Sequence, residues 1–131
     1  MLVTTYYSAI GDEVTYRIGL LLTRYALSVN EISEALQLSQ PHVSHKLARL
    51  RKLGCASCRR DGKRVIYRFT EPCRSILLHG DINWRKFNPE YASQWKGDLD
   101  ALRKMLGDGI EERTIHPVIT GPPVVPLPQT P

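Results

Sequence analysis

The sequence lacks the features of membrane and secreted proteins. No apolar run approaches the roughly 18 residues that a membrane-spanning helix needs. The N-terminal stretch MLVTTYYSAIGDE has neither the basic start nor the apolar centre of a secretory signal. Cysteine is scarce and odd in number, with three residues in the chain, so a disulfide framework is not expected. We therefore expect a cytoplasmic protein without membrane contact.

Motifs of the common enzyme classes are also missing. The chain contains no Gly-rich phosphate loop, no HExxH zinc motif and no Ser, His and Asp in the order of a catalytic triad. The four histidines are dispersed, and His42 and His45 lie in a strongly basic stretch, which is a poor setting for a general base. The sequence predicts no catalytic residue and no enzyme activity.

What the chain does contain is a concentration of positive charge in residues 39–68. This stretch holds nine Lys or Arg and a single acid, Asp61, for a net charge of +8. The remaining residues hold nine basic and twelve acidic side chains, for a net charge of −3. Clustered positive charge of this kind is typical of a nucleic-acid contact surface, although charge runs are often only solvated.

A basic amphipathic helix is predicted at the start of this stretch. Its inward stripe is Val43, Leu47, Leu50 and Leu53, at i, i+4, i+7 and i+10. Ser39 suits the N-cap, Pro41 is tolerated in the first turn, and Gly54 suits the left-handed position that ends a helix. A preceding helix, with Asn30 as its expected cap, ends near Gln37. Two helices joined by so short a turn predict a helix-turn-helix.

A basic hairpin is predicted directly after the helix. The segments Cys55–Arg60 and Lys63–Phe69 flank Asp61-Gly62, which is a strong signal for a tight turn. A helix-turn-helix followed by a hairpin is a winged helix. The fold class is therefore expected to be mainly α with a small β-hairpin.

Helical spacing predicts further elements on either side of this unit. Residues 3–10 and a segment capped by Asp12 are expected to be helices, with an extended link over residues 26–29. After the hairpin, a short helix is expected from Cys73 to Leu78. A last helix, capped by Asn88 and ended at position 107, carries an apolar stripe that we interpret as core or dimer contact. That stripe is Tyr91, Trp95, Leu99, Leu102 and Leu106.

Residues 10–70 resemble the ArsR/SmtB family of winged-helix transcriptional repressors. The matching segments are IGDEVTYRIGLLL, VNEISEALQLSQPHVSHKLARLRKLG and RRDGKRVIYRFT. The resemblance implies a homodimer that binds double-stranded DNA at a roughly palindromic operator and is released by an effector. It also implies that the first and last helices pair across the dimer.

Three regions are expected from the pattern and the resemblance together. Residues 1–70 form the winged helix-turn-helix DNA-binding domain, and residues 71–113 form C-terminal helices for dimerisation or packing. Residues 114–131 hold six of the nine prolines and form a flexible tail. A proline-rich segment that binds a partner is the alternative for the tail.

Residues for DNA contact are expected on the basic helix and the hairpin. The candidates for base contact are Gln40, His42, Ser44 and His45. The candidates for the DNA backbone are Ser39, Lys46, Arg49 and the wing residues Arg59, Arg60, Lys63 and Arg64. The alternative is that one or two of the four base-contact candidates only cap the helix or contact a phosphate.

Thiol groups are the candidates for effector sensing. The resemblance implies a metal site of the pattern ELCVCDL, but this chain reads ALSVNEI, with Ser28 and Asn30 in place of the thiols. Three cysteines remain. The hairpin brings Cys73 back beside Cys55, and together with Cys58 they could hold a thiophilic metal or metalloid ion or respond to oxidation. In a strand, however, positions 55 and 58 point to opposite faces, and all three could be purely structural.

The sequence leaves two hypotheses of function. The first is a sequence-specific DNA-binding repressor, released by a thiophilic metal or metalloid or by thiol oxidation. The second is a winged-helix module that binds protein or RNA and senses no effector.

Overall fold

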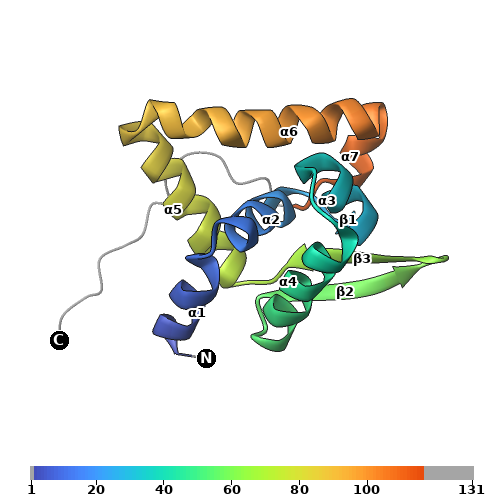
Figure 1. Ribbon diagram of the computed structural model, residues 1–131, viewed down its shortest axis with the longest axis horizontal. Coiled ribbons are helices and arrows are strands. Elements are labelled where there is room, and N and C mark those ends of the chain that lie inside the picture. The colour runs from blue at the N-terminus through green and yellow to red at the C-terminus, as the bar shows by residue number, and fades with distance from the viewer. Residues whose placement is uncertain (1, 117–131) are drawn as a thin grey trace.

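The computed structural model describes residues 2–116, which form helices around a small sheet. The elements are α1 (Val3–Ile10), α2 (Glu13–Arg24), β1 (Leu27–Ser28), α3 (Val29–Leu36), α4 (Gln40–Lys52), β2 (Ala56–Asp61), β3 (Arg64–Phe69), α5 (Cys73–Phe87), the 3₁₀ helix η1 (Pro89–Tyr91), α6 (Ala92–Leu106), the 3₁₀ helix η2 (Gly107–Gly109) and α7 (Ile110–Arg113). Figure 1 shows α2 at the centre, with α6 along one side and α4 with the β2–β3 hairpin on the other.

Helices α3 and α4 form the predicted helix-turn-helix, with one cap misplaced in the prediction. Ser28, not Asn30, caps α3: its side chain accepts from the Glu31 N–H, and Glu31 accepts from the Ser28 N–H. This reciprocal capping box satisfies two backbone donors, which a cap at position 30 could not do from inside the helix. Gln37 ends α3 in the left-handed conformation, at φ 57°. Ser39 caps α4 as predicted, by accepting from the His42 N–H.

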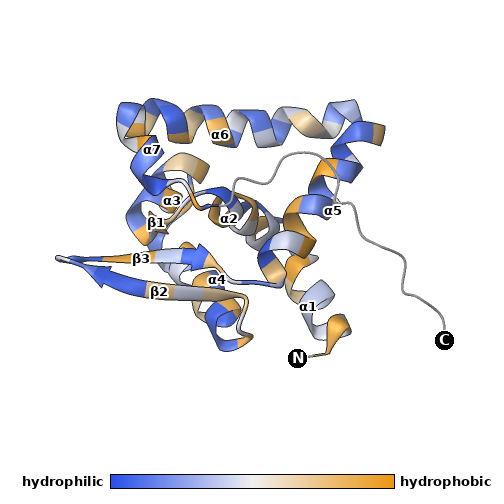
Figure 2. Ribbon diagram, turned by 180° about the vertical axis from the view of Figure 1, so that it is seen from behind, coloured by the Kyte–Doolittle hydropathy of each residue, from blue (hydrophilic) through white to orange (hydrophobic). Residues whose placement is uncertain are grey.

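The wing is a three-stranded antiparallel sheet in the order β1-β3-β2. Asp61 pairs with Arg64 at the end of the hairpin, and Gly62 has a positive φ of 63°, which confirms the predicted turn. The expected extended link before α3 is in part the strand β1, in which Leu27 pairs with Tyr67. Figure 2 shows the outer part of β2 as hydrophilic, where the hairpin projects from the body.

The segments after the wing differ from the prediction. Helix α5 does not end at Leu78 but continues to Phe87. The i, i+4 ion pair from Arg85 Nε to Asp81 Oδ2, at 2.7 Å, stabilises this extension. Asn88 does not cap the next helix. Its amide donates to the Trp84 carbonyl, Pro89–Tyr91 form η1, and α6 begins only at Ala92.

The core is built around α2. Ile18, Leu21 and Leu22 have no exposed surface. Gly19 lets α2 approach its neighbours closely, because a Cβ there would lie 2.8 Å from Leu77 and 3.0 Å from Phe69. No helix among residues 2–116 has the length and apolarity that crossing a membrane would require.

The packed chain extends slightly beyond the boundary expected at position 114. The Ile115 N–H donates to the Arg24 carbonyl at 2.8 Å, and Ile115 is only 4% exposed. The buried Arg74 donates to the carbonyls of Thr23 and Ile115. The first residues of the expected tail therefore pack against α2 and α5. Its remaining residues, 117–131, lie outside the described part of the chain.

The apolar stripe of α4 gives a stability prediction. Val43, Leu47 and Leu50 have no exposed surface, whereas Leu53 is half-buried. Leu50→Ala should lower the free energy of unfolding by about 2–5 kcal/mol, because it leaves a cavity beneath α4. Urea unfolding followed by circular dichroism measures this. Arg51→Ala, at the exposed neighbouring position, should change the free energy of unfolding by less than about 0.5 kcal/mol. Unchanged stability of Leu50→Ala would contradict this packing.

Candidate nucleic-acid interface

Helix α4 presents the four candidates for base contact to solvent. Gln40, His42, Ser44 and His45 are all exposed, while the stripe between them is buried. Pro41 and the Ser39 cap fix the first turn, where Gln40 and His42 lie. The N-terminal half of the helix therefore offers amide, imidazole and hydroxyl groups that have access to a ligand.

Ser39, the cap of α4, is exposed, and the six basic candidates for the DNA backbone divide into two groups. Arg49, Arg59, Arg60 and Lys63 are exposed, and no ion pair is recorded for them within residues 2–116. Lys46 and Arg64 have acidic partners in the protein. The Lys46 Nζ lies 3.1 Å from Asp12, and the Arg64 guanidinium lies 3.7 Å from Glu31 and 3.9 Å from Asp61.

Asp12 connects α2 with α4. Its carboxylate accepts from the backbone N–H and the hydroxyl of Thr15, at 3.1 and 2.7 Å, and so caps α2. The hydrogen bonds from Thr15, together with the one from Lys46, lower the pKa of Asp12 to about 2. The carboxylate stays ionised at neutral pH and holds Lys46 beside the start of α2.

Glu31 connects α3 with the wing and the C-terminal helix. Its carboxylate forms two hydrogen bonds with the Arg113 guanidinium, at 2.8 and 2.9 Å, and also accepts from the Ser28 N–H at 2.9 Å. Burial alone would raise the pKa of Glu31, but the hydrogen bonds from Ser28 and Arg113 outweigh it and lower the pKa. No sequence pattern indicates the pairing of Glu31 with Arg113, because 82 positions separate them.

Two of the three cysteines meet in the core. The Sγ atoms of Cys55 and Cys73 lie 3.2 Å apart, and both residues are buried. The Thr70 N–H donates to the Cys55 carbonyl at 2.9 Å and closes the loop that brings Cys73 back. The expected approach of Cys73 to Cys55 is therefore present.

Cys58 does not join this pair, so the predicted three-thiol metal site is wrong. Cys58 is half-buried on β2 and faces Tyr67 of β3 in the strand register. Cys55 lies just before β2 and is buried in the core, whereas Cys58 lies on the strand and is only half-buried. Among residues 2–116, no three His, Cys, Asp or Glu side chains are arranged to hold a metal ion.

The thiol pair has a shifted acidity. Burial, followed by the hydrogen bond between Cys55 and Cys73, raises the pKa of the Cys55 thiol to about 12. Tyr6 lies near both thiols, and burial and these neighbours raise the pKa of its hydroxyl. Cys55 is therefore a protonated thiol at neutral pH. Such a thiol is a poor metal ligand, since metals bind thiolates.

An apolar surface on α1 and α5 was not singled out from the sequence. Among residues 2–116, the exposed large apolar side chains are Leu2, Val3, Tyr7, Ile76, Trp84 and Phe87. All of them lie on α1, just before it, or on α5. Tyr7, Ile76 and Trp84 border the same cavity and so lie close together. Contiguous apolar surface of this kind marks interaction sites.

Comparisons with known proteins agree with this geometry. The family model described as bacterial regulatory protein, arsR family, matches residues 17–57. The arsenic resistance transcriptional regulator ArsR1 of Pseudomonas putida is 41% identical over 102 residues, which cover 76% of this chain and 68% of that protein.

Two solved structures share the fold. The transcriptional regulator HlyU from Vibrio vulnificus is 30% identical, with a TM-score of 0.54 over 57% of this chain and 79% of its own. The homodimeric winged helix-turn-helix DNA-binding domain Mb0332 from Mycobacterium bovis is 22% identical, with a TM-score of 0.60 over 65% of this chain and 80% of its own. These matches confirm the winged-helix fold class. Because the relatives are transcriptional regulators, they also confirm the prediction that the chain is not an enzyme.

The burial of the thiols predicts an order of chemical reactivity. In the folded protein, a pulse of iodoacetamide should label Cys58 first, and Cys55 should react much more slowly because it is buried and protonated. Peptide mass spectrometry measures the three rates. In denaturant all three cysteines should label at similar rates. Labelling of Cys55 as fast as that of Cys58 in the folded protein would contradict the buried pair.

Proposed function

This chain belongs to the arsR family of bacterial regulatory proteins, and from that premise we propose that it binds double-stranded DNA as a homodimer and represses transcription. The observation that carries the proposal is the orientation of α4. Val43, Leu47 and Leu50 of its apolar stripe have no exposed surface, and its base-contact candidates are all exposed to solvent. The second helix of a helix-turn-helix enters the major groove with its N-terminal residues toward the bases.

The wing supplies the sequence-independent part of the proposed contact. Arg59, Arg60 and Lys63 lie at the outer end of the hairpin and are exposed. They are suited to phosphates or to an adjacent minor groove. Lys46 and Arg64 are already paired with Asp12 and Glu31, so contact of these two cations with phosphates would compete with the acids. In the proposed role the protein acts where bacterial DNA lies, in the cytoplasm.

The proposed homodimer uses the apolar surface of α1 and α5. A second copy would bury Tyr7, Ile76 and Trp84, which water now surrounds in part. A two-fold dimer presents two α4 helices, so the operator is expected to be roughly palindromic, with half-sites about one helical turn apart.

The thiol pair is the proposed sensing element, without Cys58. With peroxide as oxidant, Cys55 and Cys73 each lose a proton and together two electrons, one S–S bond forms, and the peroxide is reduced to two water molecules. A 3.2 Å separation of the sulfurs requires only a small approach. The alternative, suggested by the relative named for arsenic resistance, is that arsenous acid binds both sulfurs: two As–S bonds form, two As–OH bonds break, and the two thiol protons leave with these hydroxyls as water.

DNA binding is tested with a fluorescent duplex from the region upstream of the protein's own gene. If the dimer neutralises about 6–10 phosphates, affinity should fall about 10³–10⁵-fold between about 50 and 200 mM salt. The double variant Arg49→Ala/Arg60→Ala removes four cations from the dimer. It should therefore weaken binding at low salt and reduce the slope of log affinity against log salt by about four.

The matched control removes the same charge from the opposite side of the molecule. Arg103 and Lys104 are exposed on α6, and Arg103→Ala/Lys104→Ala should leave both affinity and slope nearly unchanged. Equal losses in the two double variants would show only a net-charge effect. If the protein does not bind the duplex at low salt but does bind a single-stranded RNA or a protein partner, the result would favour the hypothesis of an interaction module.

The sensing role is tested with three single variants. Peroxide or arsenite should release the wild-type protein and Cys58→Ser from the duplex, but not Cys55→Ser or Cys73→Ser. Each variant is first shown to bind DNA in the reduced state. Mass spectrometry identifies the 55–73 disulfide after peroxide. A response that persists in Cys55→Ser and Cys73→Ser would rule out the thiol pair.

A further inference from the structure

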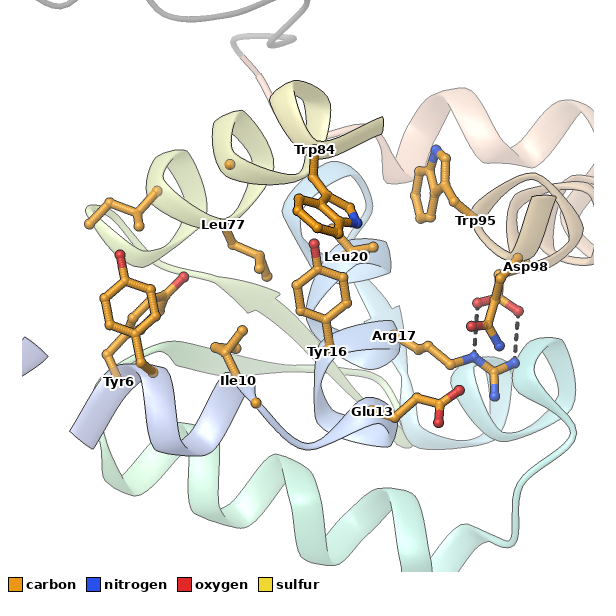
Figure 3. A pocket seen from close by; sticks show the side chains of 15 residues that line it. Tyr6, Ile10, Glu13, Tyr16, Arg17, Leu20, Leu77, Trp84, Trp95 and Asp98 are labelled. Atoms are coloured by element: carbon orange, nitrogen blue, oxygen red, sulfur yellow. Dashed lines mark hydrogen bonds and ion pairs between the residues drawn. The ribbon is translucent and has the colours of Figure 1, made fainter. Parts of the chain in front are cut away.

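A cavity of about 540 Å³ lies between α1, α2, α5 and α6, on a different part of the molecule from α4 and the wing (Figure 3). Its volume is within the range of about 300–1,000 Å³ that small-molecule sites have. Neither DNA binding nor the thiol pair uses this cavity.

The walls of the cavity are mostly apolar and aromatic. Leu20, Leu77 and Ile10 form apolar surface, and each of them is nearly inaccessible to solvent. Trp84 and Trp95, the only two tryptophans of the chain, both line the cavity. Flat aromatic walls favour a flat ligand, because stacked or edge-to-face rings attract each other beyond their buried area.

Polar interactions hold the aromatic walls in place. The Tyr16 hydroxyl donates to Asp81 at 2.6 Å, and Asp81 also accepts from Arg85 at 2.7 Å. The guanidinium groups of Arg24 and Arg85 lie 5.4 and 5.6 Å from the ring centre of Trp95. Tyr16 and Trp95 are therefore positioned before any ligand arrives, which reduces the entropy lost on binding.

One end of the cavity is charged. Arg17 donates from Nε and Nη2 to the Asp98 carboxylate, at 3.0 and 2.8 Å. This pair is neutral as a unit, and Glu13 beside it adds a negative charge (Figure 3). Among the lining residues, two acids face one guanidinium, so the charged end attracts hydrogen-bond donors and repels anions.

We propose that this cavity binds a flat, largely aromatic organic molecule whose amine or other N–H group points toward Glu13. The aromatic body lies between Tyr16, Trp84 and Leu77, and the donor meets the charged end. Binding itself is independent of the proposed DNA-binding function. Only a consequence for DNA affinity would depend on that function.

A second copy of the chain is the competing occupant. Tyr7, Ile76 and Trp84 border the cavity and also belong to the apolar surface proposed for the dimer. The charged end argues against an apolar helix as the filling, since Glu13 would lose water without gaining a donor. The small molecule therefore lies beneath the dimer contact.

Two related dyes test the site and its charge preference. N-phenylnaphthylamine is uncharged and carries one N–H, and anilinonaphthalenesulfonate has the same rings with an added sulfonate. Both tryptophans lie at the site, so energy transfer from tryptophan to dye reports binding directly. The uncharged dye should bind about ten-fold more tightly, and Glu13→Gln should narrow this difference.

Two glycines provide a blocking variant and its matched control. Gly80 on α5 lines the cavity, and an added Cβ there would meet nothing within 4 Å. Gly97 on α6 is equally unhindered and does not line the cavity. Gly80→Leu should weaken the uncharged dye about ten-fold or more, because the leucine occupies the ring's volume. Gly97→Leu should leave dye affinity within about two-fold, and thermal unfolding verifies that both variants fold.

Several outcomes would overturn the proposal. These are an absence of energy transfer, equal affinity for the two dyes, equal losses in the two glycine variants, or loss of dye binding as protein concentration rises through the range of dimer formation. The last outcome would assign the cavity to the second copy. The DNA assay on the same samples separates the two proposals. Dye binding without DNA binding would contradict the proposed function, and DNA binding without dye binding would contradict the cavity site.

Discussion

The burial of one stripe of α4 is the constraint on which the candidate interface depends. Val43, Leu47 and Leu50 have no exposed surface, and burying such side chains contributes about 1.5–3 kcal/mol each. An exposed ion pair contributes about 0–1 kcal/mol, so no rearrangement of surface charges can rotate the helix against this stripe. The apolar residues therefore decide which way Gln40 and Arg49 face.

Polar contacts then set the positions of α4 and the wing relative to the rest of the chain. Asp12 holds Lys46, and Glu31 holds Arg64 and Arg113. Both acids have pKa values below their ordinary range, so they stay charged at neutral pH. The same acids compete with phosphates for two of the cations. Part of the positive charge counted in the sequence is thus already paired within the protein. Exposed cations such as Arg60 are therefore better suited to contact with DNA phosphates.

Local signals predicted most of the local structure, whereas contacts between distant residues could not be predicted. Asp12, Ser39 and Gly62 act through neighbours within three residues, so the caps of α2 and α4 and the turn of the hairpin could be predicted. The capping box between Ser28 and Glu31 is equally local, but the cap of α3 was expected at Asn30. The full length of α5 was missed although the ion pair between Asp81 and Arg85 within it is local, and Asp81 also accepts from Tyr16, 65 positions away. The pairing of Glu31 with Arg113 could not be predicted either, because 82 positions separate them. The cavity could not be predicted because residues from α1, α2, α5 and α6 line it. Cys58 was wrongly included in a three-thiol site because the Cys-x-x-Cys spacing suggested that it lies beside Cys55. In the structure it lies on β2, outside the buried pair of Cys55 and Cys73.

Tyr6 joins the two sites for which ligands are proposed. It lines the cavity and lies near both Cys55 and Cys73. Cys55 is bonded to the last turn of α4, since its N–H donates to the Leu50 carbonyl at 2.9 Å, and Cys73 begins α5. A change in the position of Tyr6 would therefore act on the junction between α4 and the wing on one side and on α5 on the other. Because protein interiors are densely packed, the thiol pair and the cavity are neighbouring parts of one core, and Tyr6 lies next to both.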